Sequence, residues 1–116
     1  MSISKGASRW VICINNIAIK FPSLMSYTYF LYGQIANIEE MENSKFLPRE
    51  KLCPIIFHLP FGLMTVMKRA RILTEEEFSK FDYNAFCNPT FLSSYVEKKN
   101  DSFGYINDKI VAVDYA

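Results

Sequence analysis

Three short turns divide much of this chain into pairs of β-branched or apolar runs. The first turn is Asn15-Asn16, which separates residues 8–14 (SRWVICI) from residues 17–21 (IAIKF). Because asparagine tolerates the left-handed backbone conformation that two-residue hairpin loops require, this pattern predicts a β-hairpin. Side chains alternate between the two faces of a strand, so Ala18 and Lys20 are expected on one face of the second run.

The other two turns repeat this arrangement. Pro60-Phe61-Gly62 joins the apolar runs 52–59 and 63–67, and Asn107-Asp108 joins the runs 103–106 and 109–114. Both are typical of hairpin connections. The chain is therefore predicted to form an antiparallel sheet of three hairpins.

Two helices are predicted between the hairpins. Pro22 and Ser23 suit a first helical turn. Apolar residues then recur at three- and four-residue steps, at Leu24, Tyr27, Leu31, Ile35 and Ile38. This spacing predicts a helix of about five turns. Thr74 and Glu77 have the spacing of a capping box, which predicts a short helix ending near Tyr83. Residues 84–100 lack periodicity and are expected to be loop, so residues 1–116 are predicted to form a single α+β domain.

Composition and charge restrict the classes of partner. Half of the residues are hydrophobic and 16% are aromatic, which excludes a disordered chain. The formal net charge of +1 does not favour nucleic acid, although Lys68, Arg69 and Arg71 form one basic segment through which it could bind. No apolar stretch is long enough to span a bilayer, so no membrane partner is expected. Three widely spaced cysteines are typical of a reduced, cytoplasmic protein.

Four charged residues lie at positions in the predicted elements that need an explanation: Lys20, Glu40, Asp101 and Asp114. A lysine on a strand usually extends its ammonium group to solvent. The two aspartates could be turn or edge residues. Glu40 could belong to a solvated helix end, but acidic residues there oppose the helix dipole, which favours a partner such as Lys20.

The order of these residues resembles the protein kinase and aminoglycoside-phosphotransferase-like superfamily. KGASRWVICINNIAIKF resembles a glycine-rich loop followed by the strand that carries the nucleotide lysine, and FLYGQIANIEEM resembles the helix whose glutamate holds that lysine. GLMTVMKRA resembles the strand that enters the hinge between lobes. KNDSFGYINDKIVAVDYA resembles the end of the catalytic loop with the metal motif D-F-G in the form D-Y-A. The whole chain is similar to small kinase-like proteins of phages and prophages.

This resemblance implies a sheet like that of a kinase N-lobe and a site for Mg²⁺ and ATP. In such a site, Lys20 contacts phosphates and is held by Glu40. The backbone at Gly6 and Ser8 approaches a phosphate. Carboxylate oxygens bind the metal, and the residues that match are Asp101 and Asp114.

Three departures from the family pattern imply incomplete catalysis. Gly6 stands alone where the family has up to three glycines. The position of the catalytic base falls on Val96, and the nearest carboxylate, Glu97, is one place out of register. The part that receives substrate is expected to be missing after the D-Y-A motif.

We therefore expect a pseudokinase-like phage or mobile-element protein in the cytoplasm of an infected or lysogenic bacterium. It would bind a host or defence protein, as inhibitors such as anti-CRISPR factors do. The alternative is a minimal Mg-ATP-dependent phosphotransferase or nucleotide-binding module, with Glu97 as the catalytic carboxylate. Aromatic residues around the predicted long helix, Tyr27, Tyr29, Phe30 and Tyr32, leave a homo-oligomer open.

Overall fold

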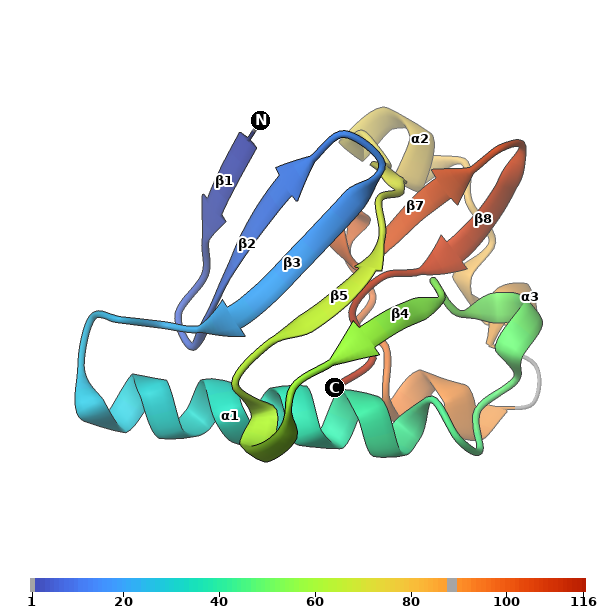
Figure 1. The fold of residues 1–116 in the computed structure, drawn as a ribbon. Helices are drawn as coiled ribbons and strands as arrows, with labels where there is room; N and C mark the ends of the chain where they lie inside the picture. The colour runs from blue at the N-terminus through green and yellow to red at the C-terminus, as the bar shows by residue number, and fades with distance from the viewer. Residues whose placement is uncertain (1, 88–89) are drawn as a thin grey trace.

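Two antiparallel sheets and a long helix dominate the structure, a computed structural model that describes residues 2–87 and 90–116 (Figure 1). The larger sheet has the strand order β1-β2-β3-β5-β4 and the smaller one the order β6-β7-β8. The strands of the larger sheet are β1 (Ser2–Lys5), β2 (Arg9–Ile14), β3 (Ile17–Pro22), β4 (Ile55–His58) and β5 (Thr65–Lys68). Those of the smaller sheet are β6 (Arg71–Ile72), β7 (Phe103–Ile106) and β8 (Lys109–Ala112). The α+β prediction is confirmed.

The three predicted hairpins are present, but they are shared between two sheets. β2–β3 and β4–β5 belong to the larger sheet, and β7–β8 belongs to the smaller one. Asn15 and Asn107 have φ of 51° and 55°, the left-handed conformation expected at these turns. Leu52, before β4, and Ala112, the last residue of β8, form an isolated parallel bridge that connects the two parts of the structure.

Three strand assignments differ from the prediction: β1 and the two-residue β6 were not predicted, and β8 ends early. β1 was not predicted, since its four residues are all exposed and show no apolar alternation. It is nevertheless ordered by pairing with β2. β8 ends at Ala112, so Asp114 lies beyond the strand instead of ending it.

The long helix α1 (Tyr27–Asn43) begins later than predicted. Pro22 belongs to β3, where it pairs with Arg9, and the Ser26 hydroxyl caps the helix by accepting a hydrogen bond from the Tyr29 N–H at 3.1 Å. Four residues therefore separate the strand from the helix. In Figure 1, α1 crosses the lower ends of the larger sheet.

The second half of the chain contains more helix than predicted. The capping box is present, with both the Thr74 and Glu77 bonds, but α2 (Glu75–Ser79) ends earlier than expected. Within the segment predicted as loop, the described residues form most of α3 (Tyr83–Phe86), the 3₁₀ turn η3 (Thr90–Ser94) and the first residue of a second 3₁₀ turn, η4 (Asn100–Ser102). Residues 88 and 89 of that segment lie outside the described residues. Elements of three to five residues are too short to produce a readable periodicity.

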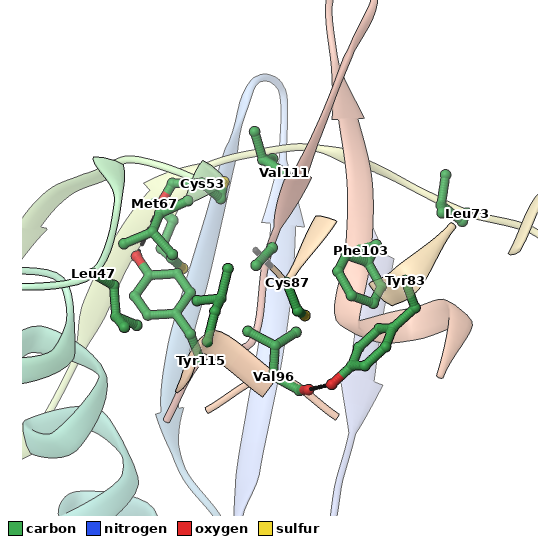
Figure 2. Close-up of a cluster of buried hydrophobic side chains, with 13 residues drawn as sticks. Leu47, Cys53, Met67, Leu73, Tyr83, Cys87, Val96, Phe103, Val111 and Tyr115 are labelled. Atoms are coloured by element: carbon green, nitrogen blue, oxygen red, sulfur yellow. Dashed lines mark hydrogen bonds between the residues drawn. The ribbon is translucent and has the colours of Figure 1, made fainter. Parts of the chain in front are cut away.

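The hydrophobic core lies beside the smaller sheet, and Figure 2 shows most of its side chains. Phe103, on β7, is fully buried and contacts the rings of Phe81, Tyr83 and Phe86. The buried hydroxyl of Tyr115 donates to the Cys53 carbonyl at 2.8 Å. The C-terminal residues are therefore part of the core. Among the helices of the described ranges, none has the length and apolarity needed to cross a membrane.

Gly33 brings α1 against the larger sheet. A Cβ atom at this position would overlap the Ser8 carbonyl oxygen and would lie 2.7 Å from Pro22 Cα. Both neighbours are backbone atoms, which cannot move aside as the end of a flexible side chain can. The close contact between helix and sheet therefore requires glycine at this position.

We predict that Gly33→Ala destabilises the protein. Alanine improves helix propensity by about 1 kcal/mol, but overpacking against rigid backbone costs about 1–3 kcal/mol, so the net effect is a loss. Urea unfolding followed by circular dichroism measures it. Thr28→Ala, on the exposed side of α1, is the control, and its unfolding free energy should change by less than about 0.5 kcal/mol. An increase in stability for Gly33→Ala would contradict the packing described above.

Candidate functional site

Lys20 and Glu40 form a buried ion pair between β3 and α1. Lys20 Nζ lies 2.9 and 3.1 Å from the two carboxylate oxygens of Glu40, and it donates a third hydrogen bond to the Val113 carbonyl at 2.5 Å. An ammonium group has three N–H donors, so all of them are used. The side chain of Lys20 is 8% exposed and that of Glu40 is fully buried.

Arg9, on β2, connects this pair to Asp114. One nitrogen of its guanidinium lies 3.0 Å from Glu40 Oε1, and the other lies 2.9 Å from Asp114 Oδ1. The first nitrogen also donates to Asn37 Oδ1 at 3.1 Å. We call Arg9, Lys20, Glu40 and Asp114 the charge cluster; its two cations and two carboxylates balance.

Glu40 also holds the C-terminal segment, since its Oε2 accepts a hydrogen bond from the Tyr115 N–H at 3.0 Å. Burial by itself raises the pKa of Glu40. The attraction of Lys20 and then of Arg9, together with their hydrogen bonds, outweighs burial, and the pKa lies below the ordinary value of 4.5. Glu40 is therefore ionised at neutral pH.

A cavity of about 650 Å³ opens beside the charge cluster. Its volume is within the range of about 300–1,000 Å³ that is typical of small-molecule sites. Its lining includes six of the seven residues that the sequence singled out, namely Gly6, Ser8, Lys20, Glu97, Asp101 and Asp114. The seventh, Glu40, lies next to the cavity through its bond to Lys20. The fold thus gathers these positions from both ends of the chain.

Two of these residues remain at the outer part of the cavity. The Glu97 side chain is 77% exposed and lies 3.3 Å from Lys99 Nζ. The Asp101 side chain is 63% exposed and lies 3.7 Å from the same nitrogen. The nearby carboxylates, first Asp101, raise the pKa of Lys99 above its ordinary value. Neither Glu97 nor Asp101 hydrogen-bonds to the charge cluster in the described residues.

The arrangement does not fit a magnesium ion. Mg²⁺ requires oxygen ligands free to coordinate it. Here Arg9 holds the Asp114 carboxylate and Lys99 lies beside Asp101, so a protein cation accompanies both expected ligands. In residues 2–87 and 90–116, no group of three or more His, Cys, Asp or Glu side chains is placed to hold a metal.

Sequence reasoning missed Arg9, Asn37 and Lys99. Arg9 shares a strand face with Val11, which pairs with Lys20 in register, so strand alternation contained a signal for it. Asn37 precedes Glu40 by three residues and therefore lies on the same side of α1. Lys99 had no comparable signal, because its segment is irregular.

The basic segment is only partly free. Arg71 stacks on the Tyr105 ring with 4.9 Å between guanidinium carbon and ring centre, and it forms a two-bonded salt bridge with Glu77 at 2.8 and 2.9 Å. That hydrogen bonding from Arg71 lowers the pKa of Glu77 to about 2. Arg69 donates to the Asn15 carbonyl, while Lys68 is exposed. The geometry adds no support for nucleic-acid binding.

Comparisons of the chain with protein-family models, with curated proteins and with solved structures give no match. The geometry of the charge cluster and its cavity therefore carries the functional argument.

We predict that Glu40→Gln lowers the unfolding free energy by about 3–5 kcal/mol, since it leaves two buried cations without their shared carboxylate. Urea unfolding at neutral pH measures the loss. Glu39→Gln, its exposed neighbour, is the matched control and should change little. Equal effects of the two substitutions would refute the importance of the cluster.

The same pair of proteins gives a pH test. Because the pKa of Glu40 is depressed in the folded state, its contribution is complete above the ordinary value of 4.5 and is lost as pH falls through the lower folded value. The stability difference between the parent and Glu40→Gln should therefore be largest at neutral pH and should shrink on acidification. A difference that grows in acid would have the wrong sign.

Proposed function

We propose that this chain is a kinase-like protein that does not transfer phosphate and that acts by binding a host or defence protein in the bacterial cytoplasm. The observation that carries the proposal is the closed hydrogen bonding of the charge cluster. All three donors of Lys20 are used within the protein, and Arg9 binds one oxygen of the half-exposed Asp114 carboxylate.

Phosphoryl transfer depends on positive charge that is free to neutralise the transferred group. In the charge cluster, the buried carboxylate of Glu40 and the half-exposed carboxylate of Asp114 already balance both cations. Moving Lys20 to a phosphate would leave fully buried Glu40 with a weaker set of partners. Loss of one partner of a buried ion pair typically costs about 3–5 kcal/mol, so opening the cluster for each nucleotide is unfavourable.

The tip of the β4–β5 hairpin supports a protein partner. Phe61 has φ of 63°, a conformation that bulky residues rarely adopt, and its side chain is among the most exposed apolar groups described, at 75%. Gln34 and Asn37 fix this turn by donating to the Phe61 and Gly62 carbonyls, each at 3.0 Å. Such strain persists mainly at functional sites, which favours a role for Phe61 in partner contact.

A nucleotide-binding module is the second candidate. The observation that favours it is the cavity of about 650 Å³, whose walls combine the backbone near Gly6 and Ser8 with the segment Met67 to Ala70. A nucleotide could enter there without magnesium. The two candidates differ in whether the folded protein gains stability from ATP.

We predict that millimolar ATP with Mg²⁺ leaves the thermal melting temperature unchanged. A ligand at a hundred times its Kd adds about 2.7 kcal/mol to the folded state, which would raise the melting temperature by several degrees. Differential scanning fluorimetry measures the shift, with Lys20→Ala and Asp114→Asn as comparison variants. A rise in the parent that both variants abolish would establish the nucleotide site and overturn the binder proposal.

The partner is tested by affinity capture from bacterial lysate. We predict that the tagged parent retains a specific protein and that Phe61→Ser loses it. Ile3→Ser on β1 is the matched control, because Ile3 is also an exposed apolar residue, at 54%, and lies far along the sheet order from the β4–β5 tip. Equal capture by both variants would show that the hairpin tip does not contact the partner. If the parent captures no specific protein, the proposal of a protein partner is wrong.

A further inference from the structure

Helix α1 buries small and polar side chains and exposes large apolar ones, the reverse of the usual arrangement. Its buried residues are small or polar: Gly33, Asn37, Glu40 and Asn43. Of the six large apolar residues of α1 that are exposed, Tyr29 lies apart, and the other five have exposures from 39% to 78%, namely Tyr27, Leu31, Tyr32, Ile35 and Ile38. Successive helical residues are about 100° apart, so these five share one side of the helix. We call this side the outer face of α1.

The outer face is large enough for a stable interface. Leu24 and Met25, which precede the N-cap residue Ser26, add exposed apolar surface at this end of α1, with exposures of 65% and 73%. An aromatic side chain offers roughly 150–250 Å² and an aliphatic one somewhat less, so these two tyrosines and five aliphatic residues, on average somewhat more than half exposed, present on the order of 700 Å². Each partner of a standard interface contributes about 800 Å². Exposed apolar surface of this extent on one segment is unusual for a monomeric protein.

Charge is distributed on α1 so that the helix complements a reversed copy of itself. No charged residue occurs from Leu24 to Ile38, whereas Glu39 and Glu42 are exposed near the C-terminal end, where Lys45, just beyond the helix, forms a solvent-exposed ion pair with Glu42 at 3.2 Å. The helix has no acidic residue in its first turn and no basic residue in its last turn, the opposite of what its dipole favours. An antiparallel neighbour corrects this, because the acidic end of each helix lies beside the N-terminus of the other.

We propose that a second copy of this chain covers the outer face of α1, with the two helices antiparallel about a two-fold axis near Ile35. Ile35 is the middle residue of α1, so it contacts its own equivalent across the axis. Glu42 then lies opposite Thr28, in the first turn of the second helix. A two-fold interface uses the same surface on both subunits, as this face allows.

The dimer leaves the charge cluster and its cavity accessible. Asn37 and Glu40 lie on the opposite side of α1, and Ala36 is the part of the helix that lines the cavity. Dimer formation therefore does not depend on the proposed function, and substitutions on the outer face do not disturb the charge cluster. The proposal adds one partner, a second copy, to the host or defence protein proposed above.

The first test is the mass of the full chain in solution, measured by light scattering after size exclusion at micromolar concentration. The expected mass is twice 13.5 kDa. Leu31→Glu and Ile35→Glu should weaken the dimer at least about thirtyfold, the effect of losing one central contact, and run as monomers with an unchanged circular dichroism spectrum. Ile56→Glu on β4, 55% exposed in the monomer, is the matched control and should remain dimeric.

The second test addresses geometry through disulfide formation under mild oxidation. Ile35→Cys should give a covalent dimer because the two positions meet at the axis, whereas Ile56→Cys and the parent, with its own three free cysteines, should not. A monomeric parent, a dimer that survives both glutamate substitutions, or failure of Ile35→Cys to cross-link each overturns the proposal. A monomeric parent that loses its captured bacterial protein on Ile35→Glu would assign the face to the host protein instead. The nucleotide and hairpin-tip experiments leave the outer face intact, so either proposal can fail alone.

Discussion

The buried carboxylate of Glu40 is the interaction on which the rest of the structure depends. It receives hydrogen bonds from Lys20 on β3, from Arg9 on β2 and from the backbone of Tyr115 near the C-terminus. An isolated carboxylate in the interior is very costly, so the helix, the sheet and the C-terminal segment must assemble together. Tyr115 in turn fills the core and donates to the Cys53 carbonyl, which extends this coupling to the segment before β4 (Figure 2).

The same carboxylate determines what the site can do. A lysine held by a glutamate beside a cavity is an arrangement suited to phosphate, provided that positive charge remains available. Here Arg9 brings a second internal cation, and Asp114 is bound to it. The cluster is therefore neutral and complete without any ligand. This balance favours a role in binding over a role in phosphate transfer.

Glu40 also explains the exposed side of α1. To reach Lys20 and Arg9, the helix must turn Asn37, Glu40 and Asn43 inward, and Asn43 Nδ2 then donates to the Tyr115 carbonyl at 2.7 Å. The side chains of Leu31, Ile35 and Ile38, which recur at helical spacing, therefore face solvent. A pattern that usually identifies the buried side of a helix identifies here the surface proposed for a second copy.

Local chemistry made much of this protein predictable from its sequence. Hairpin turns depend on the left-handed conformation of residues such as Asn15, and the capping box depends on two residues three positions apart, so both were recognised correctly. The pairing of Lys20 with Glu40 was anticipated from a resemblance and from the unfavourable position of an acidic residue at the end of a helix. Only the tertiary structure decided that Arg9 meets Asp114, that α1 buries its polar side and that the hairpins divide into two sheets. Each of these outcomes depends on which distant groups share a low-dielectric interior, and periodicity along a chain carries no record of that.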